Sequence, residues 1–86
     1  MTEQQIQKKI IDEYEKKGYY VLKLIKTNKN GIPDLLCLKR SSAPIFIEVK
    51  TANGRLSALQ KFRIDELNDL GFDAKVLNKS CNFTEQ

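Results

Sequence analysis

The chain has 86 residues, of which 41% are hydrophobic and 30% charged, and its formal net charge is +4 at pH 7. This is the size of one small domain, which we expect to span residues 1–86 and to bury about 60% of its unfolded surface. The apolar runs are too short to span a membrane and residues 1–7 carry no export signal, so we expect a cytoplasmic protein. The chain has no histidine, which excludes catalytic triads and Cys–His pairs, and its two cysteines are too few for a zinc site.

The first predicted element is a helix from Thr2 to about Lys17. Thr2 is a suitable N-cap, apolar residues recur at four-residue spacing, and Gly18 is a suitable C-terminal stop. Glu3 falls on the apolar stripe, where it either complements the helix dipole or points over the sheet toward a metal ion. Glu13, at the edge of the stripe, is the alternative acidic residue on this helix.

The next apolar run, Tyr19–Lys26, predicts the first strand. Lys23 interrupts this run, either as a solvated side chain or as a contact to a partner. The turn-rich segment Thr27–Gly31 then leads directly into Pro33–Asp34. Because of this placement, Lys29 and the backbone amides of the loop can approach a phosphate.

Two apolar runs separated by a polar break predict a β-hairpin, with strands at Asp34–Leu38 and Ile45–Lys50. Side chains alternate between the faces of a strand, so one face of this hairpin is wholly apolar and predicts the core. The residues of that face are Leu35, Cys37, Ile45, Ile47 and Val49. A buried free thiol is therefore expected at Cys37.

The opposite face of the hairpin brings charged groups together. A register with Leu38 opposite Phe46 places Asp34 opposite Lys50 and diagonal to Glu48, at about 5–8 Å. Charged groups among residues this apolar are costly unless they are paired or bound to a metal. Two neighbouring carboxylates supply the hard oxygen ligands that Mg²⁺ prefers, so we assign Asp34 and Glu48 as metal ligands.

A second helix is predicted at Leu56–Leu70, followed by a stop at Gly71 and a final strand at Asp73–Leu77. The apolar arc of this helix is broad and includes Arg63, whose stem either crosses the core edge or faces a partner subunit. The order α-β-β-β-α-β predicts an α/β fold, a small mixed sheet flanked by helices, whose last strand pairs after a helical crossover. The polar residues Asn78–Gln86 are expected to form a loose tail.

Three ordered blocks carry a resemblance to a known family: GIPDLL at 31–36, IEVKT at 47–51 and GRLSALQ at 54–60. The first two contain the P-D…E-x-K signature of restriction-endonuclease-like proteins, and the three together resemble the VRR-NUC nucleases over nearly the whole chain. The resemblance implies a small restriction-endonuclease-like αβββαβ core. It also implies a DNA endonuclease that uses Mg²⁺, for which Mn²⁺ can substitute, and no nucleotide cofactor.

The same resemblance extends the site beyond the two carboxylates. It implies that the backbone carbonyl of Val49 is a further metal ligand, and that Glu3, just before the apolar part of the first helix, lies at the metal's outer shell or at a second ion. Lys50, on the same face as Glu48, is assigned to position the attacking water or to stabilise negative charge. Gln60 matches a glutamine of the family and is expected to orient Lys50, a water or a phosphate.

The candidate DNA-binding residues are Lys23, Lys29 and Arg55, of which Lys23 lies near the DNA path in the resemblance. The chain has almost no room for a recognition domain, so binding should depend on backbone charge and DNA shape and weaken with salt. Stand-alone members of the family are similar to Holliday-junction resolvases, which implies branched DNA as substrate and a homodimer. A phage origin is suggested by the same analogy.

Two other interpretations stay open. One is a non-catalytic nucleic-acid-binding module with the same fold. The other is a structural or adaptor protein in which the charged groups of the hairpin form only an ion pair.

Overall fold

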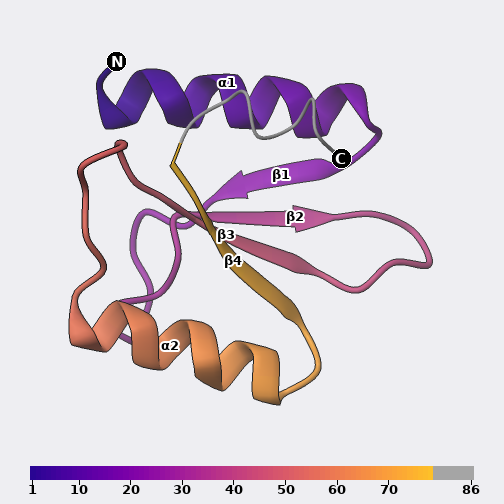
Figure 1. The fold of residues 1–86 in the computed structure, drawn as a ribbon. Coiled ribbons are helices and arrows are strands. Elements are labelled where there is room, and N and C mark those ends of the chain that lie inside the picture. Colours follow the sequence, from indigo (N-terminus) through magenta and orange to yellow (C-terminus); the bar gives the residue numbers. More distant parts are fainter. Residues whose placement is uncertain (79–86) are drawn as a thin grey trace.

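The computed structural model describes residues 1–78, which form two helices and four strands (Figure 1). In chain order they are α1 (Glu3–Lys16), β1 (Tyr20–Lys23), β2 (Leu35–Leu38), β3 (Ile45–Val49), α2 (Ala58–Asp69) and β4 (Asp73–Leu77). This is the predicted order of elements. The tail predicted at Asn78–Gln86 lies outside the described residues, apart from Asn78 itself.

The four strands form one mixed sheet in the order β1-β2-β3-β4. The first two pairings are antiparallel, whereas β4 joins β3 in parallel after the crossover through α2. The helices lie on opposite sides of the sheet, α1 against β1 and β3 and α2 against β4 (Figure 1). The predicted mixed sheet flanked by helices is therefore confirmed. Neither helix in residues 1–78 has the length and apolarity needed to cross a membrane.

The core lies between α1 and the apolar face of the sheet. The helix buries one residue per turn, at Ile6, Ile10 and Tyr14. The buried strand residues are those predicted from the alternation of the hairpin: Leu35, Cys37, Ile45, Ile47 and Val49. Cys37 is a buried free thiol as predicted, and burial raises its pKa to about 11.

Both helices begin with a capping box, in which a hydroxyl and a glutamine three residues later satisfy each other's backbone N–H. In α1 the pair is Thr2 and Gln5, which confirms the predicted N-cap. In α2 the pair is Ser57 and Gln60. The second helix therefore begins at Ala58, two residues later than predicted.

The first strand is shorter than the predicted Tyr19–Lys26, because it ends at Lys23. The N–H of Leu24 still donates to the carbonyl of Asp34 at 2.8 Å, but the chain then leaves the sheet. Residues 25–34 form a connection outside the regular strands, and this connection ends at the predicted site.

The apolar arc predicted for α2 is only partly buried. Ile64 is the buried residue of this helix, while Leu59 and Phe62 are 42% and 54% exposed. The reason is its position, because α2 packs against β4 at the edge of the sheet. Arg63 contacts a residue of its own chain, because its Nε donates to the Asn30 carbonyl at 2.9 Å. This hydrogen bond ties α2 to the loop before the site.

Candidate active site

The two predicted carboxylates meet at one end of the hairpin, but in a different register from the one expected. Leu36 pairs with Phe46, whereas the predicted register had Leu38 opposite Phe46. Continued along the strands, this register sets Asp34 directly opposite Glu48 instead of diagonal to it. A shift of two residues leaves every side chain on its predicted face, so the two carboxylates still share a face.

The turn of the hairpin explains this register. The N–H of Ser42 donates to the carbonyl of Lys39 at 3.2 Å, and Ser41 adopts a φ of 62°. A residue in the left-handed region closes the loop sharply and fixes which strand residues face each other. Because serine is not a typical residue for this conformation, the sequence carried little sign of it.

Asp34 is held in place by the neighbouring strand. Its Oδ2 accepts a hydrogen bond from the N–H of Val49 at 2.9 Å. The N–H and C=O of a strand residue point to the same edge of the strand, so the Val49 carbonyl also faces the side on which Asp34 lies. The Asp34 carboxylate thus takes the place of a backbone hydrogen-bond partner for Val49, just before the start of β2.

Glu48 is the buried acidic residue of the site, with only 3% of its surface exposed. Its Oε2 accepts a hydrogen bond from Nε2 of Gln60 at 3.2 Å and lies 3.6 Å from Nζ of Lys50. The pKa of Glu48 is raised to about 7, chiefly by burial and next by the charge of Asp34, while the charge of Lys50 acts in the opposite direction. Two carboxyl groups facing each other in a poorly hydrated position explain this direction.

Lys50 lies beside Glu48 and not opposite Asp34, where it was predicted. Its N–H donates to the carbonyl of Leu77 at 3.1 Å, which fixes the backbone just after β3. Its side chain is 16% exposed, so the ammonium group is partly desolvated next to the carboxylate of Glu48. An ammonium group in this position can donate to an anionic oxygen that reaches the site.

Gln60 has two partners that come from different parts of the chain. Its Oε1 accepts from the N–H of Ser57 at 3.0 Å, and its Nε2 donates to Glu48. The N–H of Gln60 in turn donates to Oγ of Ser57 at 3.1 Å. The same side chain therefore begins α2 and orients the buried carboxylate, a double role that the S-x-x-Q spacing signals only in part.

The acidic residues of α1 do not join the pair. Glu3 is exposed in the first helical turn, and Glu13 is half-buried further along the helix. The helix packs on the face of the sheet that carries Ile47, whereas Glu48 points to the opposite face. Across residues 1–78, no three Asp, Glu, Cys or His side chains gather into a metal-binding group. The metal-binding role expected for Glu3 stays a prediction.

The donor set of the site nevertheless suits a single Mg²⁺ ion. The carboxylates of Asp34 and Glu48 and the carbonyl of Val49 are hard oxygen donors that lie where the start of β2 meets the end of β3. The charge of Asp34 is one cause of the raised pKa of Glu48, and a divalent cation would remove that repulsion. Mg²⁺ retains several waters, so two carboxylates and one carbonyl are a sufficient protein contribution.

The three candidate DNA-binding residues, Lys23, Lys29 and Arg55, are all exposed, but they differ in their position relative to the site. Lys23 pairs with Leu35 across the strands and so shares the face that α1 covers. Lys29 lies in the loop that leads into Asp34, and Arg55 lies in the segment between β3 and α2. Lys29 and Arg55 are thus each a few residues along the chain from the site. Lys23 lies on the face of the sheet opposite to the one that carries Glu48.

Comparison with known proteins agrees with this geometry. The model of the VRR-NUC domain matches residues 20–80. A solved VRR-NUC domain superposes with a TM-score of 0.85 at 25% identity, over 96% of this chain and 90% of that one. A solved VRR-NUC domain protein gives a TM-score of 0.77 at 21% identity, over 99% of this chain and 84% of the other. At this identity the second likeness shows a shared fold only. No curated protein matches the chain. Because the family model covers more than half of its residues, the chain belongs to the VRR-NUC domain family.

Proposed function

We propose that this protein is a Mg²⁺-dependent endonuclease that hydrolyses phosphodiester bonds in branched DNA, such as a Holliday junction, as a homodimer. Family membership supports the coarser statement, since a VRR-NUC domain is a nuclease-type DNA-binding module. The observation that carries the proposal is the group of Asp34 and Glu48 facing each other, with Lys50 3.6 Å from Glu48. Like charges directly opposite on a sheet are destabilising, so a purely structural ion pair has no need of both carboxylates.

The side chains of the site have distinct tasks in this proposal. When bound, a divalent cation supplies positive charge at the scissile phosphate and lowers the pKa of a water. Asp34, held by the Val49 N–H, and Glu48, held by Gln60, provide the carboxylates that bind it. The Lys50 ammonium donates to a phosphate oxygen on which negative charge develops. Positioning of these groups before the substrate arrives avoids reorganisation during the reaction.

The homodimer is supported by an apolar surface beside the site. On the face of the sheet that carries Glu48, α2 covers β4 and leaves β1 open, so Tyr20 and Leu22 are 68% and 38% exposed. Their cross-strand partners, Leu38 and Leu36, continue the surface across β2. A second copy of the chain would bury these side chains and set two sites on one branched substrate.

The test is a cleavage assay on a labelled four-way junction, a flap, a nicked duplex and a plain duplex, each with Mg²⁺, Mn²⁺ or a chelator. We expect metal-dependent cutting, strongest on the junction. Asp34→Asn should lower the rate about 100-fold, because the carboxamide keeps one oxygen donor but loses the charge. Asp12→Asn is the matched control, since Asp12 lies on the outer side of α1 in an exposed pair with Lys8.

Three outcomes of this assay contradict parts of the proposal. Equal cutting with and without the chelator would exclude the role of the metal. Asymmetric cuts in the junction would contradict the homodimer. Folded wild-type protein that binds DNA yet cuts none of the four substrates would favour the non-catalytic nucleic-acid-binding module.

Gln60→Ala should lower the stability of the protein and also raise the Mg²⁺ concentration that cleavage requires. Loss of the capping-box hydrogen bond from the Ser57 N–H should cost about 1 kcal/mol of stability. Loss of the hydrogen bond to Glu48 should raise the Mg²⁺ concentration for half-maximal cleavage about tenfold, because outer contacts orient metal ligands. Gln5→Ala is the control, since Gln5 has the same capping role in α1. If the two variants required the same Mg²⁺ concentration, Gln60 would act only in the capping box of α2 and not in orienting Glu48.

A further inference from the structure

The helix that orients Glu48 is attached to the sheet mainly at its C-terminal half. Asn68, near the end of α2, exchanges two hydrogen bonds with the backbone of Ala74 in β4, at 3.0 and 2.8 Å. Ile64 is the buried residue of α2, and none of the helical residues before it is fully buried. Gln60 lies in this N-terminal half. Because packing alone holds that half weakly, the contact of Gln60 with Glu48 depends on a further attachment of the helix.

Arg63 supplies such an attachment. Its Nε donates to the carbonyl of Asn30 at 2.9 Å, and its Nη1 donates to Oε1 of Glu66 at 3.0 Å. The Arg63 side chain is only 17% exposed, so these hydrogen bonds are partly shielded from water. The planar guanidinium group holds both acceptors in one fixed arrangement. Arg63 thus fixes the helix to the loop at Asn30, about one turn along α2 from Gln60.

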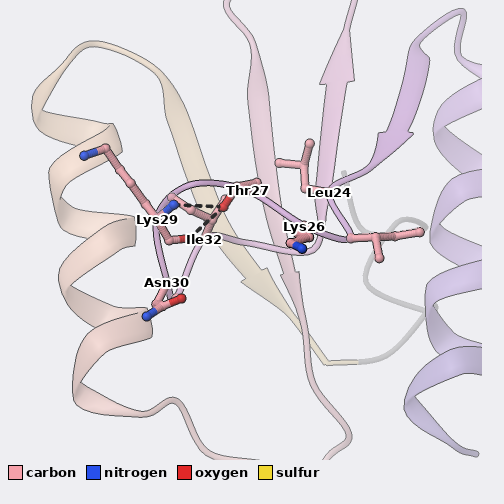
Figure 2. A pocket seen from close by; sticks show the side chains of 8 residues that line it. Leu24, Lys26, Thr27, Lys29, Asn30 and Ile32 are labelled. Carbon is pink, nitrogen blue, oxygen red and sulfur yellow. Dashed lines mark hydrogen bonds between the residues drawn. The ribbon is translucent and has the colours of Figure 1, made fainter.

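The loop end of this contact is firmly connected to the site. Asn30 begins the short stretch that leads to Asp34, and it lies on the side of the loop nearest α2 (Figure 2). Within this stretch Pro33 is fully buried. Asp34 is held by two backbone N–H groups, since its Oδ2 accepts from Val49 at 2.9 Å and its carbonyl from Leu24 at 2.8 Å. A helix attached to Asn30 is therefore positioned relative to Asp34.

The same part of α2 consequently contacts both halves of the candidate metal site. Gln60 donates to the Glu48 carboxylate at 3.2 Å, and Arg63 holds the stretch that ends at Asp34. Residues three apart on a helix are neighbours on its surface, so a shift of α2 that breaks one of these contacts also disturbs the other. The orientation of one carboxylate relative to the other therefore depends on where this helix is held.

We propose that Arg63 is a positioning residue for the metal site, an inference that rests on the proposed Mg²⁺-dependent function. It acts through Gln60, because holding α2 against the loop keeps the Gln60 amide on Glu48, so that both carboxylates can face one cation. Its own hydrogen bonds go to Asn30 and Glu66 and not to either carboxylate of the site. The positive charge of Arg63 by itself repels a cation. Positioning and electrostatics therefore predict opposite effects of removing this side chain on metal affinity.

Calorimetric titration of the DNA-free protein with Mn²⁺ tests this role without cleavage. Arg63→Met keeps an unbranched apolar stem but removes the hydrogen bonds and the charge. We expect its Kd for Mn²⁺ to rise about tenfold, the size of effect that groups orienting metal ligands have. Lys61→Met is the matched control, since it removes a positive charge from an exposed position on the same helix and should not weaken Mn²⁺ binding. Equal or tighter binding of Mn²⁺ by Arg63→Met would overturn the inference.

Combining Arg63→Met with Gln60→Ala tests whether Arg63 acts through Gln60. If it does, the double variant should bind Mn²⁺ about as weakly as Gln60→Ala alone, roughly tenfold more weakly than wild type, because the contact that Arg63 maintains is already absent. Independent effects would multiply to a loss of about 100-fold and would overturn the inference.

Two further variants separate positioning from stability. Arg63→Lys keeps the charge and a long stem, which favours folding, but an ammonium group lacks the planar fork that holds both acceptors. Its Kd for Mn²⁺ should rise about threefold, a smaller change in the same direction as in Arg63→Met. Ile10→Val lowers stability from the other face of the sheet and should leave Mn²⁺ binding unchanged. Wild-type affinity in Arg63→Lys, or a tenfold loss in Ile10→Val, would overturn the inference.

The outcomes also separate this inference from the proposed function. Mn²⁺ binding that depends on Arg63, in a protein that cuts no DNA, would keep the role of Arg63 and overturn the endonuclease. Metal-dependent cleavage by a protein whose Mn²⁺ affinity is unchanged in Arg63→Met would do the reverse. Folded wild-type protein that binds no Mn²⁺ would overturn both.

Discussion

Replacing Glu48 with glutamine should lower DNA cleavage about 1,000-fold and, at the same time, stabilise the metal-free protein. The loss of activity should exceed that of Asp34→Asn, because two groups are affected. A neutral carboxamide is a weaker metal ligand, and it also removes the charge that holds Lys50 at 3.6 Å. The gain in stability comes from the same feature, a buried acid facing another carboxylate.

The stability of the wild-type protein should therefore depend on pH in a defined direction. The pKa of Glu48 rises from 4.5 to about 7 on folding, mainly through burial and then through the charge of Asp34. Below about pH 4.5 Glu48 is protonated in both states. Between pH 4.5 and 7 the unfolded chain loses its proton first, so stability falls as the pH rises. Above pH 7 the cost is constant, and glutamine at this position avoids it.

Thermal denaturation in a chelator, from pH 5 to pH 8, measures this effect. At pH 8 we expect Glu48→Gln to be more stable by on the order of 2 kcal/mol, or about 10 °C in Tm for a domain of this size. At pH 5 the difference should shrink to about a quarter of that value, because folding then deprives only a partly ionised carboxyl of its charge. Mg²⁺ should stabilise the wild-type protein at pH 8 and the variant much less.

Glu15→Gln is the control for the change from carboxylate to carboxamide, because Glu15 is exposed on α1. It should alter neither cleavage nor the pH dependence of stability. If Glu48→Gln were less stable than wild type at pH 8 in the chelator, the two carboxylates would not be a source of instability. The proposed metal site would then lose its main energetic support.

The elements and the core were predictable because they depend on local periodicity. Ile6, Ile10 and Tyr14 recur once per turn of α1, and the alternation of the hairpin identifies the face that α1 covers. The same reasoning placed Glu3 on the apolar stripe, yet Glu3 is exposed. Periodicity gives the direction of a side chain, but it does not show that the packing of α1 begins only at Ile6.

The residues of the site were predictable, but their pairing was not. Alternation alone puts Asp34 and Glu48 on one face, whatever the register. Which residues face each other depends on the turn, and here on Ser41 in a left-handed conformation that serine does not signal. Contacts between distant segments, such as Arg63 with Asn30, depend on where α2 packs and have no local signature beyond an arginine in an apolar arc.

Replacing Gly31 with alanine should be among the most destabilising single changes outside the core. Gly31 has a φ of 81°, and an added Cβ would lie 2.7 Å from Cγ of Leu59 and 3.3 Å from its carbonyl carbon. The left-handed backbone costs about 1 kcal/mol for alanine, and the contact with α2 adds to it. We expect a total loss of about 3 kcal/mol, or roughly 15 °C in Tm, measured by thermal denaturation.

Gly71→Ala separates the two contributions. Gly71 has a φ of 98°, but its added Cβ would meet nothing within 4 Å, so only the backbone cost of about 1 kcal/mol should appear. Leu59→Ala should relieve much of the excess in Gly31→Ala, because it removes the nearest clashing atom. The contact also joins the loop at Gly31 to α2, the helix that carries Gln60, so Gly31→Ala should reduce cleavage where Gly71→Ala does not. Equal costs for the two glycines would mean that α2 can shift freely against this loop. The position of Gln60 against Glu48 would then not depend on the close approach at Gly31.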